Sequence, residues 1–268
     1  MVNFSFSCCI GSSKQGLFKD LKLNSCMGRY YALPFAVLKI TGNYEKLLTG
    51  IATNVPQAQR NAFIDIYGKI VAVFYQHRTS DGIIIAFPEQ FRKRLEAHLG
   101  TYLKLGKAKL EETALKTFFI AGEEGNGADG IKIPEKAGFA LLSENAPAAM
   151  EEMNEQEFDL FRLENGISVQ GKEFDAEMIM NTDWKDAVSF NKGCFLGQEI
   201  VSKIQNRGRP PRKLIRVLFE KEPQSVVSNG ITLLEVRSKS YSKKREKWIA
   251  YCSVQSEMNQ VDGGEIIG

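Results

Sequence analysis

The amino-acid sequence predicts an α+β fold that is followed by a small all-β module. Up to about residue 208, short apolar runs of strand length alternate with segments whose apolar residues recur at helical spacing. Beyond Pro210 and Pro211 only strand-length runs remain, and tandem prolines favour an extended link over a helix. We therefore expect an N-terminal extension over residues 1–33, a mixed core over residues 34–208 and a small β domain over residues 209–268.

The first expected elements are a strand, a short helix and a hairpin. Residues 36–40 form an apolar run, and residues 44–48 predict a short helix that begins after a polar cap. Further along, apolar runs flank residues 67–69, where Gly68 supplies the backbone angles that a tight turn needs. This pattern predicts a β-hairpin.

The clearest helix follows another strand-like run at residues 83–87. Pro88 suits the first helical position, and Phe91, Leu95 and Leu99 follow at a spacing of four. The remaining expected elements are strands at 117–121, 138–142, 214–219, 231–236 and 248–254, and helical or mixed segments at 147–153 and 158–163.

Composition bounds the class of protein. The chain has 268 residues, of which 43% are hydrophobic and 25% charged, as in globular proteins. No apolar run approaches the roughly 18 residues that a membrane-spanning helix needs. The first nine residues lack the basic start of a secretory signal. The five cysteines show no paired spacing, which argues against a disulfide framework and favours a reducing compartment, by default the cytoplasm.

Charge is unevenly distributed along the chain. Residues 144–186 contain twelve acidic and three basic residues, whereas residues 192–248 contain fourteen basic and five acidic ones. A positive field over the second segment would attract anions such as a polyglutamate tail or RNA. The alternative is two solvated faces that neutralise each other across the fold.

Several other motifs carry less weight. Residues 125–130 match GxGxxG, but a dinucleotide site needs a helix directly afterwards and Pro134 follows closely, so we expect a surface loop. His77 and His98 have no neighbour at metal-ligand spacing, and we expect no metal site. An iron–sulfur cluster held by one copy of the chain would need several converging thiolates, which the spacing does not indicate.

The segment Lys-Gly-Cys-Phe-Leu-Gly-Gln-Glu at residues 192–199 is different in kind. Its two glycines free the backbone for a tight loop, and residues 198–204 begin a short helix with apolar residues on one face. Cys194 would lie just before the start of this helix and two residues from Lys192, and both influences favour the thiolate. The alternative is that Cys194 is a small buried apolar residue.

This segment resembles the KGC[YF]xGQE signature of the YgfZ family, which is related to the folate-dependent aminomethyltransferase (T-protein) of the glycine cleavage system. Other segments agree in order, including residues 38–42, 53–55, 67–69 and 162–167, so that the resemblance covers roughly residues 34–220. It implies an aminomethyltransferase-like folate-binding fold, with two interlocked α+β subdomains around a central hole and a small C-terminal β-barrel.

The resemblance also implies a ligand and its binding residues. In the T-protein, the glutamate of the Arg-Leu-Glu-x-Gly segment hydrogen-bonds the pterin; here it is Glu164, whose carboxylate can accept two parallel N–H bonds. Read alone, Glu164 would be a surface carboxylate. The implied cofactor is tetrahydrofolate, with Arg162, Glu164, Lys192 and Gln198 as its expected binding residues and Cys194 as the functional thiol.

Two further implications concern partners and the folate tail. Family members are implicated in making or repairing iron–sulfur enzymes, including those that thiolate tRNA. We therefore expect iron–sulfur proteins or their assembly machinery as partners, and no membrane. Arg209, Arg212 and Lys213 would meet the carboxylates of the folate tail or form a generic basic face.

Departures from the family pattern bear on the choice of function. The motif tyrosine is Phe195, and the lysine-rich stretch at 243–247 is unfamiliar; these departures bear on partner specificity more than on the fold. A true aminomethyltransferase, the alternative function, carries an aspartate pair shortly after the hairpin glycine. Here Gly68 is followed by Lys-Ile-Val-Ala, so an accessory protein is favoured over the transferase. RNA binding by the basic segment remains as a weak tRNA contact, since its aromatic residues are sparse and no RNA-binding signature accompanies them.

Overall fold

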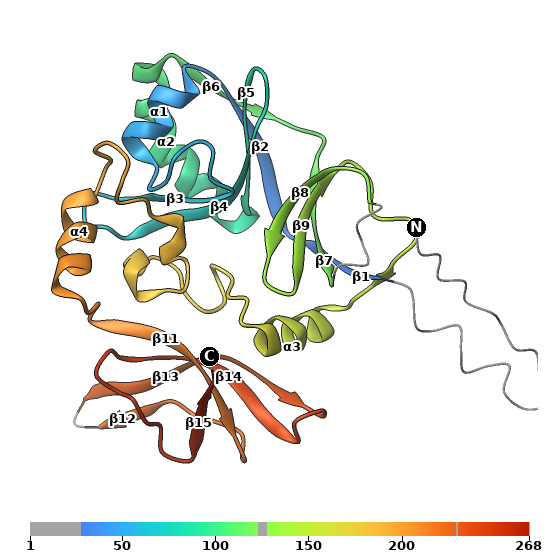
Figure 1. Cartoon of the computed structure of the whole chain (residues 1–268), viewed down its shortest axis with the longest axis vertical. Coiled ribbons are helices and arrows are strands. Elements are labelled where there is room, and N and C mark those ends of the chain that lie inside the picture. Colours follow the sequence, from blue (N-terminus) through green and yellow to red (C-terminus); the bar gives the residue numbers. More distant parts are fainter. Residues whose placement is uncertain (1–27, 123–127, 229, 268) are drawn as a thin grey trace, which may run out of the picture.

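The chain forms three five-stranded sheets, shown from the N-terminal blue to the C-terminal red in Figure 1. This computed structural model describes residues 28–122, 128–228 and 230–267. Residues 1–27 and the first three residues of the GxGxxG segment, 125–127, lie outside the described residues, so the surface loop expected there stays a prediction.

The N-terminal sheet has the strand order β3-β4-β5-β2-β6, and neighbouring strands are antiparallel. Its strands are β2 (Phe35–Gly42), β3 (Arg60–Ile64), β4 (Ile70–Arg78), β5 (Gly82–Pro88) and β6 (Ala108–Glu112). Helices α1 (Tyr44–Ile51) and α2 (Arg92–Gly106) cover one face, where Leu48, Leu95 and Leu99 are fully buried. A single turn of 3-10 helix, η1 (Glu89–Phe91), precedes α2.

The predicted hairpin and helices are present, with local differences. In the hairpin, the Asp65 carboxylate accepts hydrogen bonds from the main-chain N–H groups of Tyr67 and Lys69, and Gly68 has a φ of 76°. The polar cap expected before α1 makes no side-chain hydrogen bond to the helix.

The middle sheet has the order β10-β1-β7-β9-β8. Its strands are β1 (Arg29–Leu33), β7 (Lys116–Ala121), β8 (Ile131–Glu135), β9 (Gly138–Ser143) and β10 (Glu151–Glu152). Only Pro34 separates β1 of this sheet from β2 of the N-terminal sheet, so the chain runs almost directly from one sheet into the other (Figure 1).

Two expectations for this region were wrong. Residues 29–33 were expected to belong to a loosely attached extension, but they form β1, which pairs with both β7 and β10. The reason is long-range packing, because Tyr31 and Leu33 lie against Phe119 and Phe158 in one apolar cluster. The segment at 147–153, expected to be helical or mixed, instead contains the short strand β10.

The C-terminal sheet has the order β12-β13-β14-β11-β15 and curls into part of a barrel, with β12 and β15 at its edges (Figure 1). Its strands are β11 (Arg212–Phe219), β12 (Val226–Ser228), β13 (Ile231–Ser242), β14 (Lys247–Gln255) and β15 (Gly264–Ile267). The strand β11 begins directly after Pro210 and Pro211.

Four connecting helical elements position the candidate site. Helix α3 (Glu155–Asn165) has a capping box made by Asn154 and Glu157 and lies between the middle and C-terminal sheets, with Phe158 in the cluster of the first and Leu163 in that of the second. The segment after α3 carries the short 3-10 helices η3 (Ile179–Asn181) and η4 (Lys185–Ala187). Helix α4 (Gln198–Arg207) then leads into β11 (Figure 1).

The face of the N-terminal sheet opposite α1 and α2 is also covered. A second cluster joins Val37 and Ile84 of this sheet to Leu142 of the middle sheet and to Trp184 and Phe195. The motif segment at 192–199 is therefore anchored in the same core that joins the two sheets. No helix within the described residues is both long and apolar enough to cross a membrane.

Candidate functional site

The motif loop is held by its neighbours in three dimensions. Gly197, at the N-cap of α4, has a φ of 79°, and a Cβ there would lie 2.4 Å from the carbonyl oxygen of Asp65. Only glycine combines this backbone angle with such a close approach to the hairpin. Phe195 is buried, and the main-chain N–H of Leu196 donates to the carbonyl of Gly50 at 3.0 Å.

Lys192 holds the loop against the end of α1. Its Nζ donates to the carbonyl oxygens of Ala52 at 2.6 Å, Asn54 at 3.1 Å and Leu48 at 3.3 Å, and it lies 5.2 Å from the centre of the Phe195 ring. These three carbonyls accept the three protons of the ammonium group, and those of Leu48 and Asn54 also accept from the Ala52 N–H and from the Asn61 side chain. Lys192 therefore fixes the position of the loop, rather than acting as a counter-ion aimed at Cys194 as its sequence spacing indicated.

Burial lowers the pKa of Lys192 from 10.5 to about 8. Between about pH 8 and pH 10.5, the unfolded chain holds a proton that the folded chain has lost, so this lysine makes stability rise with pH in that window. Lys192→Met is expected to remove this rise, measured as the free energy of unfolding in urea at a series of pH values.

The control is Lys172→Met. Lys172 pairs with Glu155 and Asp159, which help to raise its pKa, so it contributes no such rise. If the free energy of unfolding changed with pH in the same way in both variants, the buried charge assigned to Lys192 would be contradicted.

Gln198 closes the loop from the other side. Its Oε1 accepts from the main-chain N–H of Phe195 at 3.3 Å, and its own main-chain N–H donates to the Phe195 carbonyl at 3.1 Å. These bonds make a tight turn directly before α4. Lys192 and Gln198 thus both act on the backbone of the motif.

Cys194 is exposed at the tip of this loop. Of the two cysteines in the described part of the chain, the other, Cys252, is fully buried in the C-terminal sheet, and burial raises its thiol pKa to about 12. The hairpin that touches Gly197 also carries the exposed side chains of Ile66 and Tyr67. An exposed thiol on a braced loop is accessible to a partner, whereas Cys252 is not.

Arg162 lies deep between α3 and the segment that follows it. Its guanidinium donates to Glu173 Oε1 at 2.6 Å and to Asp159 Oδ1 at 2.7 Å, and the side chains of Arg162 and Glu173 are 1% and 0% exposed. The other oxygen of Glu173 accepts from the main-chain N–H of Val169 at 2.8 Å. A buried pair with this many bonds fixes the backbone that follows α3.

Glu164 faces the C-terminal sheet. Its carboxylate accepts a hydrogen bond from the Ser242 hydroxyl at the end of β13, and Arg216 of β11 donates to its main-chain carbonyl at 2.8 Å. The structure thus places Glu164 at the junction between α3 and the C-terminal sheet, away from Lys192 and Gln198. The four predicted folate-binding residues do not converge on one site.

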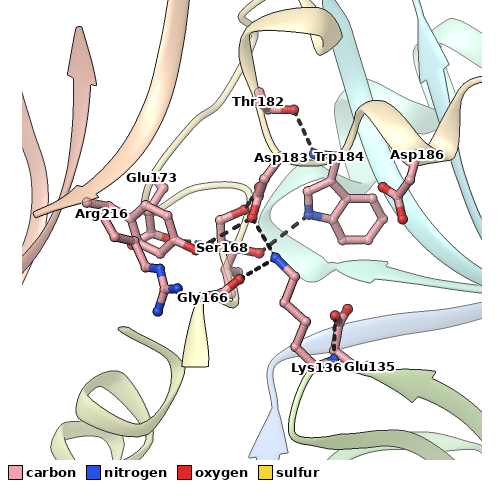
Figure 2. Close-up of polar contacts among 12 residues, drawn as sticks. Glu135, Lys136, Gly166, Ser168, Glu173, Thr182, Asp183, Trp184, Asp186 and Arg216 are labelled. Carbon is pink, nitrogen blue, oxygen red and sulfur yellow. Dashed lines mark hydrogen bonds and ion pairs between the residues drawn. The ribbon is translucent and has the colours of Figure 1, made fainter. Parts of the chain in front are cut away.

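A polar cluster centred on Asp183 joins the core to the C-terminal sheet (Figure 2). The carboxylate of Asp183 accepts a short hydrogen bond from Ser168 and a longer one of 3.5 Å from Tyr251, and it lies 3.5 Å from Lys136 Nζ. Lys136 also donates to the Gly166 carbonyl at 2.7 Å. This cluster was not expected from the sequence, because its members come from four distant segments.

A cleft lies between the middle sheet, η1, α3 and the segment at 169–172. Its volume is about 240 Å³, and it narrows to a recess of about 20 Å³ between the sheets. Its walls are mainly apolar, with the rings of Tyr31 and Phe158 stacked 4.2 Å apart and Arg162 beside them. The recess has room for about one water molecule, so side chains fill most of the central hole that the family resemblance implies.

Comparison with solved structures identifies the fold. Glycine cleavage system aminomethyltransferase T from Bartonella henselae superimposes with a TM-score of 0.72 at 12% identity, over 90% of this chain and 84% of that one. The chain has the aminomethyltransferase fold. The predicted α+β fold class is therefore confirmed.

Comparison with curated proteins finds a relative in iron–sulfur biology. The iron-sulfur cluster assembly factor IBA57 homolog, mitochondrial, of Dictyostelium discoideum is 29% identical over 109 residues. The match covers 38% of this chain and spans about a quarter, 27%, of that relative's length. No family model matches the chain. The two matches support the YgfZ-type, aminomethyltransferase-related family that the motif predicts.

Among the described residues, no carboxylate lines the recess. Val73, which lies just after the hairpin, lines the recess, and its main-chain N–H donates to Gln170. Tyr75 is the one ionisable side chain among the described residues lining the recess; it donates to Glu135, and burial raises its pKa well above 10. The recess therefore has no carboxylate to serve as a general base at neutral pH.

Sequence reasoning missed the cleft residues Tyr31 and Phe158. Tyr31 lies in the segment expected to be an extension, and Phe158 was recognised only as part of a helical or mixed run. A large apolar residue at every second position, Tyr31, Leu33 and Phe35, was the available signal for a buried strand.

Proposed function

We propose that this chain is an accessory protein of iron–sulfur cluster assembly or repair that presents the thiol of Cys194 to a partner protein. The observation that carries the proposal is the exposed Cys194 on a loop whose backbone is held by Lys192, Gln198 and Gly197. The Dictyostelium discoideum relative, named as an iron-sulfur cluster assembly factor, supports this assignment.

The chemistry follows from the thiol. A cysteine thiolate binds iron, and most clusters need four ligands. Among the described residues, no group of three or more His, Cys, Asp or Glu side chains is placed to bind a metal. Cys194 would therefore contribute one ligand to a cluster whose other ligands come from the partner, and the cluster is the cargo of the interaction.

The experiment that tests this function is restoration in cells that lack the protein. Expression of the full chain should restore the activity of a [4Fe–4S] enzyme, while a cluster-free enzyme measured in the same extracts stays constant. In the cells that lack the protein, tRNA thiolation should also be lost where the thiolating enzyme itself carries a cluster. Unchanged activity of the cluster enzyme after expression would contradict the proposal.

We further propose tetrahydrofolate as the ligand of the cleft beside Arg162. The cleft volume and its apolar, aromatic wall suit a planar ring, with Tyr31 and Phe158 to pack against it. Lys172 at the rim would meet a carboxylate of the tail. When bound, tetrahydrofolate would supply a reduced pterin that carries one-carbon groups. The recess without a carboxylate favours a ligand role over the alternative, aminomethyl transfer.

Titration calorimetry with two variants tests the placement of this ligand. Tyr31→Ala is expected to weaken tetrahydrofolate binding about fivefold, the size of one aromatic contact. Glu164→Ala is expected to leave the affinity within about twofold, because its carboxylate is bonded to Ser242. The reverse pattern would show that Glu164 leaves Ser242 to bind the pterin, as the resemblance implies, and absence of heat with the wild type would refute folate binding.

The cellular compartment of this chain can be tested directly. The relative's name places that protein in mitochondria, and the cytoplasmic location of this chain stays a prediction. Cell fractionation with antibodies against the chain distinguishes the two.

A further inference from the structure

A second cavity, separate from the cleft, lies between the core and the C-terminal sheet. It is a groove of about 590 Å³, bounded by the β8–β9 turn, the segment at 180–185, the link from α4 to β11 and the turn after β14. Lys136 and Asp183, whose contact is drawn in Figure 2, are among the residues that line it. Neither the proposed thiol chemistry nor the proposed folate cleft uses this groove.

Four cationic side chains line the groove, from Lys136, Lys185, Arg209 and Lys213, against two acidic ones. One of the acids is Asp183, whose carboxylate is already bonded to Ser168 and Tyr251 and pairs with Lys136. The other is Glu257. The groove therefore carries an excess of positive charge.

Most of these cations have no acidic partner. Within the described residues, neither Lys185 nor Arg209 forms an ion pair, and Lys213 donates to the neutral amide oxygen of Asn259 at 3.3 Å. Elsewhere in the basic segment, by contrast, Arg237 pairs with Glu177 and Lys247 with Glu220. Pairing neutralises much of the basic segment, and the groove is one place where cations remain available to a ligand.

The wall of the groove is preformed. The carbonyl of Pro210 accepts from the Ser256 hydroxyl, and the Ser256 main-chain N–H donates to the Pro211 carbonyl at 3.3 Å. Proline also limits the backbone beside Arg209. Binding of an anion here would therefore lose little conformational entropy, because the backbone on this side is already ordered.

A further group in the wall favours a ligand with hydrogen-bond donors. The Oδ1 atom of Asn181, which lines the groove, is shielded from solvent and has no hydrogen-bond partner. Asn181 is half-buried, and once its side chain turns towards the groove an amide N–H of a ligand would satisfy this atom, whereas a phosphodiester has no donor to offer. Cations for carboxylates and an acceptor for an amide thus occur together in one groove.

We propose that this groove binds a chain of carboxylates joined by amide bonds, as found in an acidic peptide segment or in an oligo-γ-glutamyl tail. The two sources share the chemistry that the groove recognises and differ in the linkage between residues. The inference does not depend on the role proposed for Cys194.

Titration calorimetry of the full chain at low ionic strength, with tetra-α-glutamate and tetra-γ-glutamate as probes, tests the proposal. We expect one binding site, with an affinity that falls as salt is added. Arg209→Ala combined with Lys213→Ala should weaken binding about tenfold, from the loss of two partly exposed ion pairs. Tighter binding of the α-linked probe identifies a peptide segment, and tighter binding of the γ-linked probe identifies a glutamyl tail.

The matched control is Lys243→Ala combined with Lys244→Ala. It removes the same charge from the exposed turn between β13 and β14, outside the groove, and should leave the affinity within about twofold. Equal weakening in the two double variants, absence of binding by both probes, or equally tight binding of tripolyphosphate would overturn the proposal. If the first double variant unfolds, Lys185→Ala, on the exposed η4 turn, provides the same comparison.

Discussion

Cys194→Ser is expected to abolish restoration of the cluster enzyme while leaving the fold intact. The substitution replaces one sulfur by oxygen at an exposed position, so it disturbs no packing, but an alcohol does not supply the thiolate that iron requires. The measurement is the activity of the [4Fe–4S] enzyme in cells lacking the protein, with the amount of soluble variant determined in the same extracts.

Two controls separate chemistry from structure. Asn191→Ser changes another exposed residue shortly before the same loop and should restore activity like the wild type. Alkylation of the folded protein, read peptide by peptide, should modify Cys194 well before Cys252, because Cys252 is buried and its pKa is raised to about 12. Full restoration by Cys194→Ser would assign the motif cysteine a structural role.

Arg162→Met is expected to destabilise the fold by about 3–5 kcal/mol, the cost of leaving a buried charge without its partner. The carboxylate of Glu173, with no exposed surface, would keep only the Val169 N–H as a donor. Urea unfolding followed by circular dichroism measures the loss, and the cleft beside Arg162 would lose its shape at the same time.

The exposed pair formed by Lys172 is the control for this prediction. Lys172→Met should cost less than about 1 kcal/mol, since its partners Glu155 and Asp159 remain in contact with water. Adding Glu173→Gln to Arg162→Met should recover part of the loss, because it removes the unpaired charge. A cost for Arg162→Met no larger than that for Lys172→Met would refute the role given to the buried pair.

The sequence predicted the elements whose signals are local. The hairpin at 67–69, the helix after Pro88 and the change to strands after Pro211 all appear in the structure. The strands β1, β6, β8, β10, β12 and β15 were missed, because they are short and most of them are held by partners far along the chain. For β1, the deciding partners are Phe119 and Phe158.

In the candidate site, too, the local features could be predicted and the long-range contacts could not. By itself, the sequence determined the form of the motif loop, because glycine backbone angles and the helical spacing after Gln198 are properties of neighbouring residues. It also predicted the YgfZ-type family from the eight-residue signature, and the two matches support that prediction.

Only the tertiary structure decided which groups these residues meet. Lys192 binds carbonyls about 140 positions earlier in the chain, and Glu164 meets Ser242 78 positions later. The sequence spacing of Lys192 and Cys194 indicated a charge beside a thiol, but in the structure the ammonium group binds three carbonyls in the last turn of α1 and just beyond it. Contacts of this kind depend on how sheets and helices pack, and no local pattern of residues encodes them.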